Sequence, residues 1–105
     1  EGMEFSDYSI LLVEDDMNDV MLIRRAFSRA GIVNPLVVAG NGEEAVAYLV
    51  ERGDGGRDET WSLPVLILLD LKMPRMSGFE FLEWIRKQDR LRRIPVVVLT
   101  SSNHS

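Results

Sequence analysis

Acidic and hydroxyl side chains follow three of the apolar runs in this sequence, at the point where each run ends. The acidic residues 14–16 come after the first run, Asp70 comes after the third, and Thr100 and Ser101 follow the last. Carboxylates gathered in one place repel one another, and Mg²⁺ relieves that repulsion while leaving coordination positions for phosphate oxygens. Carboxylates also form aspartyl phosphates, so this pattern indicates a phosphoryl-transfer site.

Each of these residues also has an ordinary structural interpretation. Asp16 can cap a helix, Asp70 can open a turn and Thr100 can end a strand. The functional interpretation therefore depends on whether the fold brings the three strand ends to one place.

Apolar runs alternate with segments of helical periodicity along the chain. The runs predict strands at Ser9–Val13, Pro35–Ala39, Val65–Leu69 and Pro95–Leu99, all of them buried. The periodic segments predict helices at Met17–Ala30, from Glu43 to about Glu51, and from the turn at 73–78 to about Lys87. This β-α-β-α-β-α-β order is typical of an α/β, flavodoxin-like fold, with a parallel sheet covered by helices on both faces.

The apolar spacing also predicts which side of each helix faces the sheet. The first helix should bury Val20, Ile23, Ala26, Phe27 and Ala30 and end at Gly31. The third should bury a stripe of Phe79, Leu82 and Ile85, widened by Phe81 and Trp84. Asn41 or its neighbouring glycines should start the second helix.

The expected topology gathers the polar strand ends. Right-handed crossovers place every carboxyl end of a parallel sheet at one edge, where open α/β proteins bind their ligands. The first and third strands are neighbours in the flavodoxin-like order. We therefore expect Glu14, Asp15 and Asp70 to lie together there.

Composition excludes several kinds of site. A chain of 105 residues holds one domain, and the absence of cysteine excludes disulfides and thiolate metal sites. The one histidine, His104, excludes multi-histidine zinc sites. Glu1 and Gly2 are interpreted as added residues that precede a native start at Met3 and lie outside the domain.

Charge and hydropathy exclude two kinds of partner. The net charge of −5 argues against a nucleic-acid protein. The cations Arg86, Lys87, Arg90, Arg92 and Arg93 cluster, but we interpret them as favourable charges at a helix C-terminus. The longest apolar run, Val65–Leu69, is far below the roughly 20 residues of a membrane span. A cytoplasmic protein is expected.

Three segments together resemble the receiver domain of two-component response regulators. These are Ile10–Asp16, Leu68–Gly78 and Ile94–Thr100, in the family's order and spacing. Within the family, the extended loop Gly53–Ser62 and the ending Leu99–Ser102 are most similar to stand-alone receivers paired with bacterial phytochrome-type histidine kinases.

The resemblance implies a chemical role for each matching residue. Asp70 matches the acceptor of a phosphoryl group from the phosphohistidine of a sensor kinase. Asp15 matches a direct Mg²⁺ ligand and Glu14 a ligand acting through water, with Asp70 and the backbone carbonyl of Lys72 completing the set. Thr100 matches the switch hydroxyl that binds the phosphoryl oxygen. The protein is then a signalling phosphoacceptor rather than an enzyme that turns over a substrate.

Two further positions follow from the resemblance. Ser101 takes the small-residue position beside Thr100. Met17, Asn18 and Met21 correspond to the surface that docks the kinase's phosphotransfer helices, although ordinary packing would also explain the two methionines.

The sequence departs from the family after Thr100. Receivers continue through a helix, a fifth strand ending in a lysine that pairs with the phosphoryl group, and a final helix. None of these follows here, so residues 3–105 are expected to form a C-terminally incomplete receiver domain. A homodimer or an element-swapped dimer is one way to cover the sheet face that the last helix would leave open.

Other functions stay open beside the phosphoacceptor. One alternative is a pseudo-receiver or truncated interaction fragment without phosphoryl switching. A phosphatase that forms an aspartyl-phosphate intermediate is less favoured. Such enzymes have an Asp-x-Asp pattern whose second aspartate acts as acid and base, and the residue two positions after Asp70 is Lys72. A nucleotide-binding flavodoxin-like protein is less favoured again, because acids replace the phosphate-binding glycines after the first strand.

Overall fold

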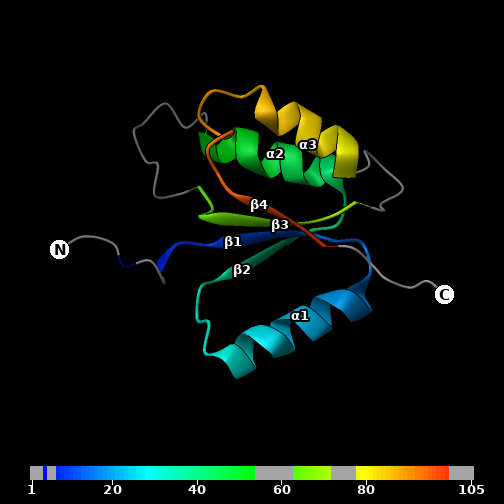
Figure 1. The fold of residues 1–105 in the computed structure, drawn as a ribbon, viewed down its shortest axis with the longest axis vertical. Coiled ribbons are helices and arrows are strands. Elements are labelled where there is room, and N and C mark those ends of the chain that lie inside the picture. Colours follow the sequence, from blue (N-terminus) through cyan, green and yellow to red (C-terminus); the bar gives the residue numbers. More distant parts are fainter. Residues whose placement is uncertain (1–3, 5–6, 54–62, 72–77, 100–105) are drawn as a thin grey trace.

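The computed structural model describes residues 4, 7–53, 63–71 and 78–99, which form seven elements (Figure 1). In chain order these are β1 (Ile10–Val13), α1 (Met17–Ala30), β2 (Leu36–Ala39), α2 (Gly42–Gly53), β3 (Leu66–Asp70), α3 (Gly78–Arg86) and β4 (Val96–Leu99). The predicted alternation of strands and helices is confirmed, with boundaries shifted by one or two residues.

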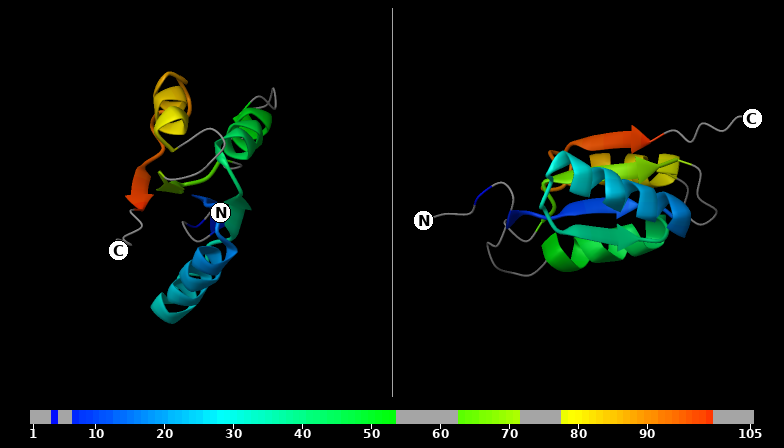
Figure 2. Two further views of the ribbon diagram at one scale, coloured as in Figure 1. Left: turned by 90° about the vertical axis from the view of Figure 1, so that its right-hand side faces the viewer. Right: turned by 90° about the horizontal axis from the view of Figure 1, so that it is seen from below.

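The sheet is parallel throughout, in the order β2-β1-β3-β4. α1 covers one face, and α2 and α3 lie side by side on the other (Figures 1 and 2). This arrangement confirms the predicted flavodoxin-like fold. Among the described helices, none combines the length and apolar character needed to cross a membrane.

β1 shows why the sheet forms from these residues. All four of its side chains are buried, which requires a strand that is apolar on both faces. Leu11 and Val13 belong to the cluster under α2 and α3, and Ile10 and Leu12 belong to the cluster under α1. The two clusters hold both helical layers onto one central strand.

Polar groups fix both ends of α1. The side chain of Asp16 caps the helix by accepting from the backbone N–H of Asn18 at 2.8 Å. Gly31 ends it with a φ of 76°, in the left-handed region that glycine adopts most readily. Of the predicted inward residues, Val20, Ile23 and Phe27 pack on the sheet. Ala26 and Ala30 are exposed instead, because short side chains at the margin of the stripe do not reach the sheet.

The start of α2 confirms the predicted role of Asn41. Its side-chain oxygen accepts from the backbone N–H of Glu44 at 2.9 Å, and the Glu44 carboxylate accepts from the N–H of Gly40 at 2.7 Å. This pair satisfies backbone donors that a helix start leaves open.

The inward stripe of α3 differs from the predicted one. Phe81 and Ile85 are buried, whereas Phe79 is 66% exposed. The reason is Gly78, because an added Cβ there would lie 2.5 Å from the Cα of Leu71. That close approach sets the rotation of the helix, and the line through 78, 81 and 85 faces the sheet.

β4 is also less buried than predicted. Val97 is 47% exposed and Val98 is 38% exposed. Among the described strands, β4 is at the end of the sheet order, so its apolar sequence did not require burial on both faces.

Candidate functional site

The carboxyl ends of β1 and β3 bring three acids together, as predicted. Glu14 follows β1 and Asp70 ends β3, and the Cα pairing of Val13 with Leu69 sets these two strand ends side by side. One carboxylate oxygen from each of Glu14, Asp15 and Asp70 lies within 4.8 Å of the others. The cluster is therefore built from residues far apart in the sequence.

The three acids differ in exposure. Glu14 is 4% exposed and Asp70 is 6% exposed, while Asp15 is open to solvent. Two carboxyl groups thus lie inside the protein, and the third is accessible to a ligand from the solvent.

Glu14 is held by two hydrogen bonds. Its carboxylate accepts from the backbone N–H of Asp16 at 3.1 Å. In its protonated form the Glu14 carboxyl also donates a hydrogen bond to the carboxylate of Asp70, which favours that form. The cluster therefore raises the pKa of Glu14.

The protonation of Glu14 follows from this environment. Burial raises the pKa of Glu14 from 4.5 to about 7, although the Asp16 N–H lowers it. The negative charge of Asp70 and the hydrogen bond that protonated Glu14 donates to it raise the pKa of Glu14 further, and the charge of Asp19 adds a smaller increase. The sequence prediction missed Asp19, because it considered only strand ends. The signal was available, since Asp19 lies in the first turn of the helix that follows the acids.

The donor set fits a hard divalent cation. Mg²⁺ prefers one or two carboxylates and keeps several waters, and this cluster offers two buried carboxyls and one exposed one. A bound cation would offset the repulsion among these carboxylates. The chemistry of the residues is therefore compatible with a magnesium site.

The amino end of α3 also borders the cluster. The N–H of Gly78 donates to the carbonyl of Leu71 at 3.4 Å, and an added Cβ would lie 2.6 Å from the backbone oxygen of Asp70. The helix thus fixes the backbone that carries Asp70, and its positive end lies beside an anionic site.

The other predicted site residues divide into two groups. Met17 and Met21, at the start of α1, are 66% and 57% exposed, and Asn18 between them is exposed as well. This surface is therefore accessible to a partner. Lys72, Thr100 and Ser101 lie outside the described residues, as does most of the loop Gly53–Ser62.

Comparison with known sequences identifies relatives over most of the chain. The sequence model of the response regulator receiver domain matches residues 10–105. Probable methanogenesis regulatory protein FilR2 of Methanothrix harundinacea is 46% identical over 95 residues, covering 90% of this chain and 59% of that protein. Response regulator Rcp1 of Synechocystis sp. is 40% identical over 95 residues, covering 90% of this chain and 63% of that protein. The chain spans about three fifths of the length of these relatives.

Solved structures show the same fold. The phosphorylated cyanobacterial phytochrome response regulator RcpA superposes with a TM-score of 0.77 at 40% identity, covering 93% of this chain and 68% of that chain. The Mn²⁺-bound form of Rcp1 superposes with a TM-score of 0.75 at 38% identity, with the same two coverages. The predicted similarity to phytochrome-associated response regulators is thus confirmed.

Proposed function

The chain belongs to the response regulator receiver family, and from this premise we propose that Asp70 accepts a phosphoryl group from the phosphohistidine of a sensor histidine kinase. The observation that carries the proposal is the gathering of Glu14 and Asp15 around Asp70 at the carboxyl edge of the sheet. Receivers as a family are signalling phosphoacceptors, and one similar structure is described as phosphorylated.

The proposed step is a direct transfer. A carboxylate oxygen of Asp70 attacks the phosphorus, a bond between oxygen and phosphorus forms, and the phosphorus–nitrogen bond to the histidine breaks. The electron pair of the broken bond stays on the histidine nitrogen. Asp70 is suited to this role because it ends β3 at the edge of the sheet where Glu14 and Asp15 also lie.

We further propose that Asp15 and Asp70 bind Mg²⁺ directly, with Glu14 acting through water and the backbone carbonyl of Lys72 as a further ligand. When bound, the cation supplies positive charge that stabilises the charge developing on the transferred group. The support is the oxygen donor set of this cluster. The Mn²⁺-bound Rcp1 structure provides a parallel in a relative.

The remaining roles complete the proposal. The Cα of Leu99, at the end of β4, pairs with that of Asp70, so the chain continues to Thr100 from the strand beside the acceptor. Thr100 is proposed as the switch hydroxyl, with Ser101 leaving space beside it. The exposed Met17, Asn18 and Met21 are proposed to contact the kinase, in the cytoplasm.

Intact-protein mass spectrometry tests the transfer. The protein is incubated with acetyl phosphate, with and without Mg²⁺, alongside Asp70→Asn and the control Asp7→Asn, an exposed aspartate that precedes the amino end of β1, opposite the end that carries the site. We expect one Mg²⁺-dependent phosphoryl adduct on the wild type and on Asp7→Asn, and none on Asp70→Asn. Equal incorporation in the Asp70 variant would reject Asp70 as the acceptor.

A further inference from the structure

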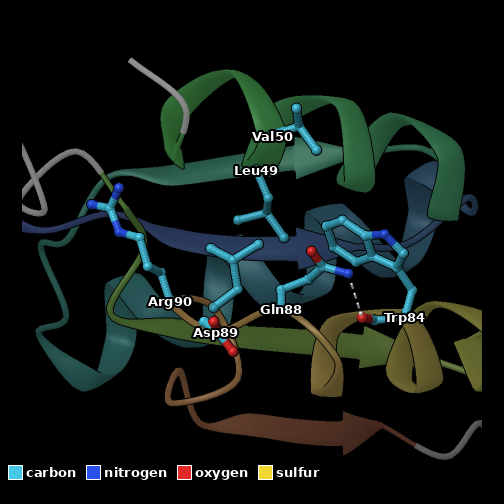
Figure 3. A pocket seen from close by; sticks show the side chains of 7 residues that line it. Leu49, Val50, Trp84, Gln88, Asp89 and Arg90 are labelled. Atoms are coloured by element: carbon cyan, nitrogen blue, oxygen red, sulfur yellow. Dashed lines mark hydrogen bonds between the residues drawn. The ribbon is translucent and has the colours of Figure 1, made fainter. Parts of the chain in front are cut away.

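A second candidate site lies at the far ends of α2 and α3, away from the acidic cluster. A pocket of about 260 Å³ opens there between α2 and the turn after α3 (Figure 3). Leu49 and Val50 contribute from α2, Trp84 contributes from α3, and Leu91 contributes from the turn. Because α3 starts beside Asp70 and ends here, the two sites occupy opposite ends of one helix.

The pocket has an apolar floor. Leu49 is fully buried and Leu91 is 6% exposed, so both are fixed by the core. Val50, at 42% exposure, forms an accessible apolar lip. Figure 3 shows Leu49 pointing from α2 into the space that Gln88 and Trp84 border on the other side. Such a cavity suits a large apolar side chain.

Hydrogen bonds order the end of α3 and the turn after it, which form one wall of the pocket. The side-chain amide of Gln88 donates to the carbonyl of Trp84 at 3.1 Å. In the turn, the N–H groups of Leu91 and Arg92 both donate to the carbonyl of Gln88, at 3.2 and 2.9 Å. The walls are therefore pre-organised, which lowers the cost of binding.

The surroundings of the pocket are basic. We call residues 86–93 the basic segment, because it holds five cations and one acid, Asp89, in a chain of net charge −5. Its cations are exposed. The helix-dipole interpretation explains only those near the end of α3 at Arg86, since the effect fades within the last turn. It does not explain Arg92 and Arg93, which lie beyond the helix.

We propose that this pocket and the basic segment bind an acidic peptide segment of a partner protein, with one large apolar side chain of the peptide in the pocket. Charge complementarity favours an acidic partner, and the apolar floor favours a peptide anchor. The apolar floor separates the two kinds of anionic partner, because an acidic peptide carries an apolar side chain that can fill the space above Leu49 and Leu91, whereas a phosphodiester backbone carries none.

An NMR titration of the full chain tests the proposal. The probe is a short synthetic peptide in which glutamates flank one phenylalanine. Its controls replace the phenylalanine by alanine or the glutamates by lysines, and oligothymidylate represents single-stranded nucleic acid. We expect shifts at the Trp84 indole, the Gln88 amide and the Leu91 backbone, with about tenfold weaker binding of the alanine peptide. The lysine peptide should leave these signals unchanged.

Two pairs of variants separate the pocket from general charge effects. Val50→Asp places a carboxylate on the lip and should weaken binding about tenfold, whereas Val33→Asp, at another exposed valine after α1, should not. Arg92→Glu should weaken binding about fivefold, and Arg25→Glu on α1 should not.

Three results would overturn the proposal. One is the absence of glutamate-peptide shifts at the pocket, and another is equal affinity in the two members of each variant pair. The third is a preference of this surface for oligothymidylate over the acidic peptide. If Val50→Asp no longer gives the spectrum of a folded protein, the comparison of Arg92→Glu with Arg25→Glu tests the proposal by itself.

Discussion

The carboxyl edge of the sheet holds two buried carboxyl groups, Glu14 and Asp70, beside the exposed Asp15, whereas the far end of α3 carries the exposed cations of the basic segment. A buried carboxylate must be neutralised or paired, so Glu14 takes up a proton near neutral pH. Exposed cations keep their water and cost little. The stability of the acidic end therefore depends on pH and on bound cations. The basic end instead attracts anionic partners over a long range.

The contrast extends to the backbone, and two glycines test it. Gly78→Ala at the acidic end forces a Cβ to within 2.5 Å of Leu71 and 2.6 Å of Asp70, both backbone atoms that cannot move aside. We expect a loss of about 3 kcal/mol in the free energy of unfolding, measured by urea denaturation.

The matched change is Gly31→Ala, at the end of α1. That position has a φ of 76° but no atom within 4 Å of an added Cβ, so only backbone strain opposes it, at about 1 kcal/mol. Equal losses in the two variants would show that α3 does not fix the acidic end as tightly as the geometry indicates.

A second prediction concerns pH. The pKa of Glu14 rises from 4.5 to about 7 on folding, so between these values the folded chain holds a proton that the unfolded chain has lost. The resulting stability is fully present below about pH 4.5 and is lost as pH rises through about 7. Without divalent cations, we expect the free energy of unfolding to fall by roughly 3 kcal/mol over this window.

Replacing Glu14 should remove this dependence. Glu14→Gln keeps the shape and loses the titration, so its free energy of unfolding should stay nearly level when urea denaturation is compared at about pH 5 and about pH 8 in EDTA. The control Glu51→Gln removes an exposed carboxylate in α2 and should retain the wild-type slope. A wild-type slope in Glu14→Gln would assign the titration to another group.

The smallest predicted effects compare the two ends of α1. Asp16→Ala removes the cap on the Asn18 N–H and should cost about 1 kcal/mol, whereas Asp16→Ser should restore most of it. Arg29→Ala, in the last turn, should cost only about 0.3 kcal/mol, because an exposed cation there acts through the helix dipole alone. Thermal unfolding of the three variants measures the difference, and a larger loss from Arg29→Ala would contradict this ranking.

The sequence was sufficient for the sheet and for the acidic cluster. Strands that are apolar on both faces, such as Ile10–Val13, have few alternatives to burial in a parallel sheet, and topology then brings Glu14 next to Asp70. The order of the apolar strands and the topology that it predicts were therefore sufficient to locate the site.

Other features depended on contacts that local patterns do not encode. The rotation of α3 follows from the approach of Gly78 to Leu71, so the pattern that favoured Phe79 as a buried residue was misleading. The exposure of Val97 depends on the position of β4 in the sheet order, and the pKa of Glu14 depends on burial and on Asp70 and Asp19. Each of these properties arises between elements rather than within one.

The pairing of β1 with β3 also has a consequence for the folding of the protein. β1 and β3 are adjacent in space, yet α1, β2 and α2 all separate them along the chain, so this is the least local of the strand pairs. Glu14 meets Asp70 only when that large loop closes, and until then Glu14 titrates as an ordinary glutamate. In a refolding experiment near pH 6, the moment of proton uptake by Glu14 would therefore report when β1 pairs with β3. The reporter is a carboxyl group of the functional site itself.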